Sequence, residues 1–206
     1  MKMVRLVLCF LFAECSFLAA QPLTVTPEVV LGHRSSFYQH ELTFLLTDKL
    51  KLRNTSLYDA AYDDPKAVLY FFRNTLAYAA SKSIVFSVAH GVKNPGAFGT
   101  ASVLYHYSSS RIVLMCSGGV TYQREFSFEP FVLLEYNTPV SAGRHLFFRV
   151  QGVANISKES YMRGVQQVRV GLKQDKLRYG LAGNFDQFAN AAKKLSNLGV
   201  FIRYTI

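Results

Sequence analysis

Side chains suited to nucleophilic catalysis are few in this sequence and do not assemble into a complete set. If the chain folds back as a hairpin about Lys82, Asn74 lies opposite His90. A serine two residues from that histidine would complete a Ser/His/Asn arrangement for acyl transfer, but valines occupy both such positions. His106 stands next to Ser108–Ser110, which has the composition of a turn. The sequence therefore predicts a protein that is not an enzyme.

The remaining reactive residues give no metal or cofactor site. The five histidines are isolated and lack the spacing of metal ligands. No glycine-rich loop follows a strand and opens a helix, so no phosphate-binding loop is predicted. Cys116 is the only cysteine after residue 20, and it has no partner for an internal disulfide. We expect no cofactor and no metal.

The stretch from Gly164 to Phe185 shows the pattern that positions the charged side chains. Apolar residues such as Val170 alternate with polar ones such as Arg169, and the alternation resumes after the polar turn 174–176. Two period-two runs joined by a tight turn predict a β-hairpin.

Nearly all of the chain after residue 20 repeats this pattern. Tight polar turns alternate with longer connections, of which 186–197 is predicted to be the longest loop. The predicted class is all-β, and the expected strands number about twelve: 23–31, 37–46, 50–59, 68–79, 84–91, 98–107, 111–122, 126–136, 144–156, 164–173, 177–185 and 198–206.

The first twenty residues have the layout of a secretory signal peptide. Lys2 and Arg5 precede a short apolar run, and small residues lead to an expected cleavage after Ala20. A buried N-terminal helix and an acylated Cys15 are the alternatives. Residues 1–20 are thus predicted to be a signal peptide and residues 21–206 a single β-barrel domain.

The chain of 206 residues carries a formal net charge of +10, which by itself would suit nucleic acid or an acidic membrane surface. The basic residues are scattered singly along the strands, and the only cluster is Lys193-Lys194. The predicted export of the chain and the scattered basic residues together predict that nucleic acid is not a partner.

Alternation alone fits two kinds of barrel. A soluble lipocalin-like barrel encloses its apolar face, whereas a membrane barrel turns that face to lipid. Strands of about ten residues match a tilted bilayer crossing. Aromatic residues also recur at the strand ends of the apolar face, as in an interfacial girdle: Tyr38, Tyr78, Tyr107, Tyr122, Phe126, Tyr136, Tyr179 and Tyr204. We therefore predict an antiparallel, up-and-down transmembrane β-barrel.

On these features the chain resembles bacterial outer-membrane β-barrels of the porin-like type. The last strand, with Leu198, Val200, Ile202, Tyr204 and Ile206 on one face, resembles the terminal signal of such barrels. The resemblance implies a place in the bacterial outer membrane, contact with its lipid and lipopolysaccharide, and recognition by the barrel-assembly machinery. It leaves the oligomeric state open.

The polar face of the strands would line the lumen. Ten charged side chains are expected to line it, and basic residues predominate among them: Glu41, Lys51, Arg53, Arg73, Glu135, Arg149, Arg169, Lys173, Arg178 and Arg203. Four more carboxylates are expected to face inward: Glu28, Asp59, Glu129 and Asp186. Rings of basic side chains favour anions, so one prediction is a passive, porin-like channel for small, anionic solutes. The alternative is an accessory or structural barrel whose lumen is plugged by ion pairs. An outer-membrane phospholipase-like enzyme and a soluble lipocalin-like barrel are less favoured.

Overall fold

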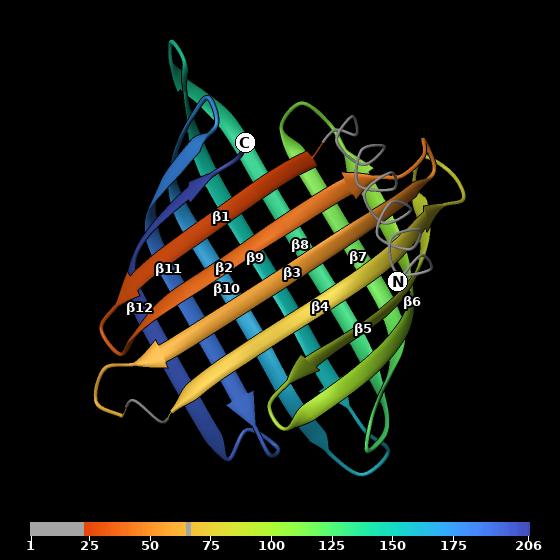
Figure 1. The fold of residues 1–206 in the computed structure, drawn as a ribbon. Helices are drawn as coiled ribbons and strands as arrows, with labels where there is room; N and C mark the ends of the chain where they lie inside the picture. Colours follow the sequence, from red (N-terminus) through yellow and green to blue (C-terminus); the bar gives the residue numbers. More distant parts are fainter. Residues whose placement is uncertain (1–22, 65–66) are drawn as a thin grey trace, which may run out of the picture.

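Twelve antiparallel strands form one closed barrel in a computed structural model that describes residues 23–64 and 67–206 (Figure 1). Each strand is hydrogen bonded to its sequence neighbours, which confirms the predicted all-β, up-and-down architecture. The predicted signal peptide lies outside the described residues. The strands are β1 (Leu23–Gly32), β2 (Ser35–Leu45), β3 (Leu50–Ala61), β4 (Val68–Ala79), β5 (Ile84–Lys93), β6 (Gly96–Ser108), β7 (Ile112–Gln123), β8 (Glu125–Ser141), β9 (Arg144–Ile156), β10 (Tyr161–Gln174), β11 (Leu177–Phe188) and β12 (Lys193–Tyr204).

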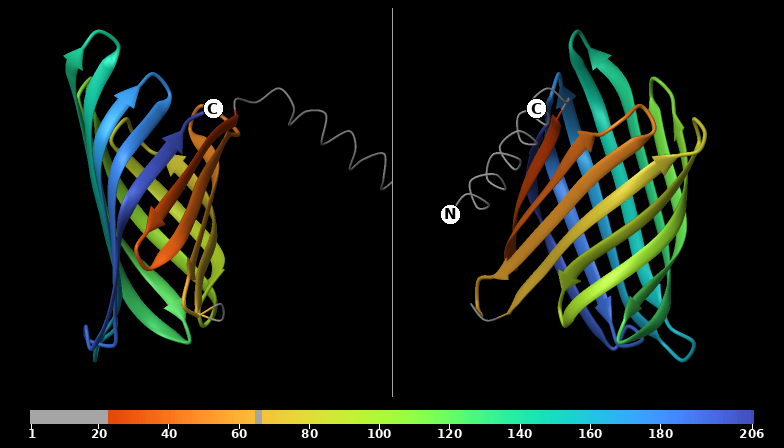
Figure 2. Two further views of the ribbon diagram at one scale, coloured as in Figure 1. Left: turned by 90° about the vertical axis from the view of Figure 1, so that its left-hand side faces the viewer. Right: turned by 45° about the vertical axis from the view of Figure 1, so that its right-hand side comes forward.

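The barrel closes where β1 pairs with β12. Val30 lies opposite Phe201 in this seam, and the backbone of Val25 exchanges hydrogen bonds of 3.3 and 2.8 Å with Ile206. The first strand, predicted at residues 23–31, is therefore present and makes the strand number even. As a result the beginning of β1 and the C-terminus lie at the same end of the barrel, here called the terminal end (Figure 2).

The connections are short at both ends, which corrects the predicted alternation of short turns and long loops. The expected long loop 186–197 is mostly strand, because β11 continues to Phe188 and β12 begins at Lys193. The expected connection 137–143 is likewise mostly strand, since β8 continues to Ser141. The resulting β8–β9 hairpin projects beyond its neighbours at the terminal end (Figure 2).

The outer wall of the barrel is apolar over most of its circumference. Large apolar side chains at alternate positions are exposed, for example Leu181 and Phe126, each 68 % exposed. The aromatic residues expected at the strand ends are exposed as well, except Tyr136, which is half-buried. No helix in residues 23–64 and 67–206 is long and apolar enough to cross a membrane.

The inner wall is closely packed where two glycines meet. Gly171 on β10 pairs with Gly180 on β11. On the flanking strands, Phe147 of β9 lies opposite Gly171 and Phe201 of β12 lies opposite Gly180. With no side chains between them, the two phenylalanine rings approach across β10 and β11 until their centroids are 6.0 Å apart. Both rings are buried, and they form the core together with Val30. This row fills one side of the lumen.

Candidate functional site

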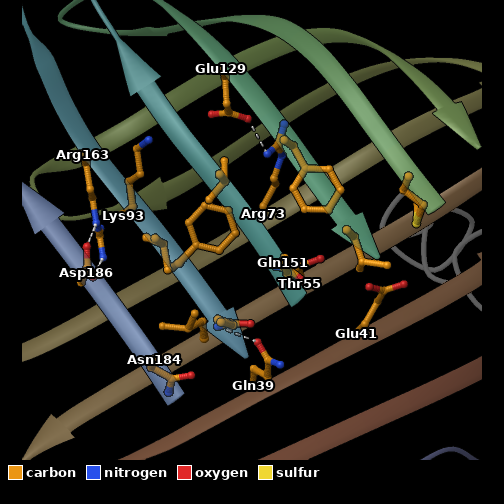
Figure 3. A pocket seen from close by; sticks show the side chains of 18 of the residues that line it. Gln39, Glu41, Thr55, Arg73, Lys93, Glu129, Gln151, Arg163, Asn184 and Asp186 are labelled. Atoms are coloured by element: carbon orange, nitrogen blue, oxygen red, sulfur yellow. Dashed lines mark hydrogen bonds and ion pairs between the residues drawn. The ribbon is translucent and has the colours of Figure 1, made fainter. Parts of the chain in front are cut away.

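The rest of the lumen is a cavity of about 380 Å³. Its wall is formed by β2–β12 and mixes charged with apolar side chains (Figure 3). The charged groups form three clusters. The first lies at the end of the barrel opposite the terminal end, the second lies on the side filled by Phe147 and Phe201, and the third lies near the terminal end. Prominent among the apolar side chains on the wall are Phe37, Leu57, Phe71, Met115, Phe131 and Leu133.

The first cluster surrounds Glu129 near the end opposite the termini. The Glu129 carboxylate accepts hydrogen bonds from Arg73 Nη1 at 2.9 Å, Thr121 Oγ1 at 2.8 Å and Asn155 Nδ2 at 3.0 Å. Lys93 Nζ donates to Asn155 Oδ1 at 3.0 Å, so its ammonium group lies beside the same carboxylate. Figure 3 shows Arg73, Lys93 and Glu129 converging on the cavity.

Two more ion pairs lie at this end. Arg163 forms a bidentate contact with Asp186, with N···O distances of 3.0 and 2.5 Å, and Arg34 pairs with Asp59. Asn184 lies two residues before Asp186 on the same face of β11 and borders the cavity. Its amide is buried, and neither its oxygen nor its nitrogen has a hydrogen-bond partner in the described chain.

The second cluster is fully buried and centred on Glu28. Arg169 contacts Glu28 Oε1 through Nε at 3.0 Å and Nη2 at 2.7 Å, while Arg203 Nη2 lies 2.6 Å from Oε2. Gln39 Nε2 donates to Oε1 at 2.8 Å. The side chains of Glu28 and Arg169 are 0 and 1 % exposed, so solvent does not hydrate their charges and the ion pairs must stabilise them instead.

The third cluster, near the terminal end, is looser. Glu135 lies 3.5 Å from Arg149 and 4.0 Å from Arg178, and Arg53 lies 3.3 Å from Glu41. Longer distances and greater exposure make these contacts weaker than those around Glu28.

Five of the ten residues expected in the lumen border the cavity directly: Glu41, Arg53, Arg73, Glu135 and Arg149. Arg169, Arg178 and Arg203 are held in ion pairs on the filled side. Lys51 is exposed and Lys173 half-buried, and neither borders the cavity.

Sequence reasoning missed three basic groups of the lumen. Arg34, Lys93 and Arg163 were assigned to connections between strands, whereas Lys93 ends β5, Arg163 belongs to β10, and Arg34 lies in the two-residue turn before β2. Arg163 is in step with Gln167 and Arg169, but Val165 on the same face is apolar and Gln166 on the other face is polar, so alternation gave no clear signal for Arg163.

With these residues included, basic groups outnumber acidic ones in the lumen. Eight arginines and Lys93 face six carboxylates in the three clusters. Each of the six carboxylates is already paired with an arginine, so the excess charge is positive.

Comparisons with known proteins bear on the fold. No family model and no curated protein matches the chain. Among solved structures, an outer membrane channel from Pseudomonas putida F1 matches with a TM-score of 0.49 and 11 % identity over 89 % of this chain and 94 % of the other. LpxR from Salmonella typhimurium matches with a TM-score of 0.45 and 10 % identity, over 88 % of this chain and 99 % of the other. A loop-deletion mutant of OmpT, an outer membrane protein of Vibrio cholerae, matches with a TM-score of 0.41 and 8 % identity, over 91 % of this chain and 100 % of the other. In architecture, the chain resembles bacterial outer-membrane β-barrels.

The prediction that the chain is not an enzyme rested on the missing serine nucleophile, and the comparisons overturn it. The similar structures include LpxR and OmpT beside a channel, and a barrel fold does not fix whether a chain has enzymatic activity. The expected pair of Asn74 and His90 does form on the outer wall, with 3.5 Å between Nδ2 and Nε2.

Proposed function

We propose that this chain forms a solute pathway in the bacterial outer membrane that admits small organic anions. The observation that carries the proposal is the charge along one continuous cavity. Six cations and five carboxylates border it, and Lys93 is the excess cation. A net positive lumen attracts anions and repels cations. The apolar side chains on the same wall suit a solute that has an apolar body as well as a charge.

The size of the cavity limits the solute. A volume of about 380 Å³ is near the lower end of the range for small-molecule sites, which is roughly 300–1,000 Å³. Arg73, Lys93 and Arg163 would meet a carboxylate at the end opposite the termini, and Asn184 has donor and acceptor atoms available to it.

Planar-bilayer recording of the purified protein tests this proposal. We expect discrete current steps. In a salt gradient, the sign of the reversal potential should indicate a preference for anions, and hexanoate should block the chloride current. Lys93→Gln should weaken the anion preference, whereas Lys82→Gln in the exposed β4–β5 turn should leave it unchanged. Absence of current steps, or a preference for cations, would refute the proposal.

A second candidate is an accessory barrel without transport of its own. The buried Glu28 network and the ring pair Phe147–Phe201 favour it, because they fill the lumen beside β9–β12 and β1. In that case the wild-type protein gives no current steps, and anions do not change its thermal stability.

A further inference from the structure

A group of five polar side chains interrupts the mostly apolar outer wall. Alternation on β2–β5 turns them outward, away from the inward residues Gln39, Thr55 and Arg73 that border the cavity. We call this group the outer polar patch; it consists of His40, Asn54, Ser56, Asn74 and His90.

The strand register gathers the patch into one surface. Asn54 lies opposite Asn74, and Asn74 lies opposite His90, so these three form a row across β3, β4 and β5. His40 on β2 lies opposite Ser56 on β3. The patch therefore crosses four neighbouring strands without interruption.

Hydrogen bonds link most of the patch. Ser56 Oγ donates to Asn54 Oδ1 at 3.0 Å, and Asn54 Nδ2 donates to Asn74 Oδ1 at 2.8 Å. Asn74 Nδ2 lies 3.5 Å from His90 Nε2. Each asparagine has two N–H donors, and within the described chain these contacts engage one on each, so capacity remains for groups outside the barrel.

The depth of the patch makes contact with lipid unfavourable. His40 and Ser56 stand near the middle of their strands, with the exposed apolar Leu76 and Val88 toward the terminal end and Tyr70 toward the other. At mid-membrane depth, polar groups normally face protein or water, because lipid chains cannot hydrogen bond to them. No described loop of the chain covers the patch, since the connections are short.

We propose that the outer polar patch is the contact surface between two copies of this chain in the membrane. The patch has no formal charge when its histidines are neutral, and its amides and hydroxyl are both donors and acceptors. Such a surface can pair with itself about a two-fold axis. The wall of β2–β5 is about 19 Å wide and about 33 Å long at ordinary strand dimensions. This area of roughly 600 Å² approaches the 800 Å² or so that each partner buries in a stable dimer.

Cysteine cross-linking in membranes tests the proposal. The starting chain has Cys9, Cys15 and Cys116 replaced by alanine or serine, and it receives either Ser56→Cys in the patch or Val132→Cys on the outer wall of β8. Val132 is outward, 44 % exposed and near the middle of its strand, so it is a matched control for depth. After mild oxidation in vesicles of phosphatidylethanolamine and phosphatidylglycerol, we expect a dimer from Ser56→Cys in several-fold excess over Val132→Cys.

A second measurement separates contact with protein from contact with lipid. Asn54→Leu/Asn74→Leu should convert a dimer to a monomer in mild detergent, as measured by light scattering, while the monomer keeps its heat-modifiable mobility on gels. Equal cross-linking at both positions in vesicles, or an unchanged mass of the Leu variant, would overturn the proposal. So would a repeat of the oxidation in native membranes in which Ser56→Cys cross-links only to other proteins. Conductance through single barrels does not enter these readouts, so the proposed function stands or falls separately.

Discussion

The buried Glu28 network gives the sharpest prediction, because one carboxylate there neutralises two arginines. Glu28→Gln removes the charge while keeping nearly the same shape. Arg169 and Arg203 would then lie 1 and 5 % exposed without a counter-ion. Removing one partner of a buried ion pair typically costs about 3–5 kcal/mol, and we expect the free energy of unfolding to fall by that amount.

A matched variant with the same chemical change sets the scale. Glu135→Gln also removes a carboxylate beside two arginines, but its contacts are 3.5 and 4.0 Å long and the partners are 16–18 % exposed. The longer contacts and the partial exposure make these interactions weaker, so the loss should be smaller than for Glu28→Gln. The difference between the two variants isolates the effect of burial.

Urea titration of the protein in lipid vesicles measures both losses, with tyrosine fluorescence and gel mobility as probes. Unfolding free energies follow from linear extrapolation, and an unchanged slope with urea would show that the unfolded states are comparable. Glu28→Gln/Arg169→Gln should regain part of the stability, because one of the two uncompensated charges is gone. If Glu28→Gln is no less stable than Glu135→Gln, the ion network does not hold the barrel wall as described.

Three further predictions concern the fold and its orientation. Gly171→Ala should cost at least about 1–3 kcal/mol, because a Cβ there would lie 2.0 Å from the Tyr179 carbonyl oxygen, whereas Gly96→Ala meets nothing within 4 Å and should be neutral in the same titration. The protein should fractionate with outer membranes and change its gel mobility on boiling; a soluble protein with unchanged mobility would contradict the membrane assignment. If the last strand runs down to the periplasm, the β11–β12 turn lies outside the cell and the β10–β11 turn faces the periplasm. With the native cysteines removed, Ala192→Cys should then react with an impermeant maleimide in intact cells and Lys176→Cys only after permeabilisation, and the reverse would invert the orientation.

The strands and their faces could be predicted because alternation is a local property of the sequence. The hairpin of β10 and β11 shows this, since Val170 and Leu181 lie opposite each other on the outer wall as the pattern indicates. Strand ends were predicted poorly. Asn94-Pro95 and the polar segment 186–197 suggested long connections, yet backbone pairing continues close to each turn.

The contacts within the lumen could not be predicted, because they depend on which strands lie across the barrel. Arg169 on β10 finds Glu28 on β1, and Arg73 on β4 finds Glu129 on β8. These partners are 141 and 56 residues apart in sequence. Alternation places each side chain inside, but the barrel's closure and tilt determine which charges meet.

The β3–β4 wall also explains why only Asn74 and His90 of the outer polar patch emerged from sequence reasoning. Residues 53–56 read Arg-Asn-Thr-Ser, and residues 73–75 read Arg-Asn-Thr, so the middle of both strands is polar on both faces. Such segments carry no apolar alternation, and they specify strand register weakly. The hydrogen bond between Asn54 and Asn74 supplies a register contact instead. It lies on the outer face, and lipid alone cannot satisfy the remaining donors of these amides. A wall that is polar on both sides is therefore consistent with a cavity on the inside and a protein partner on the outside.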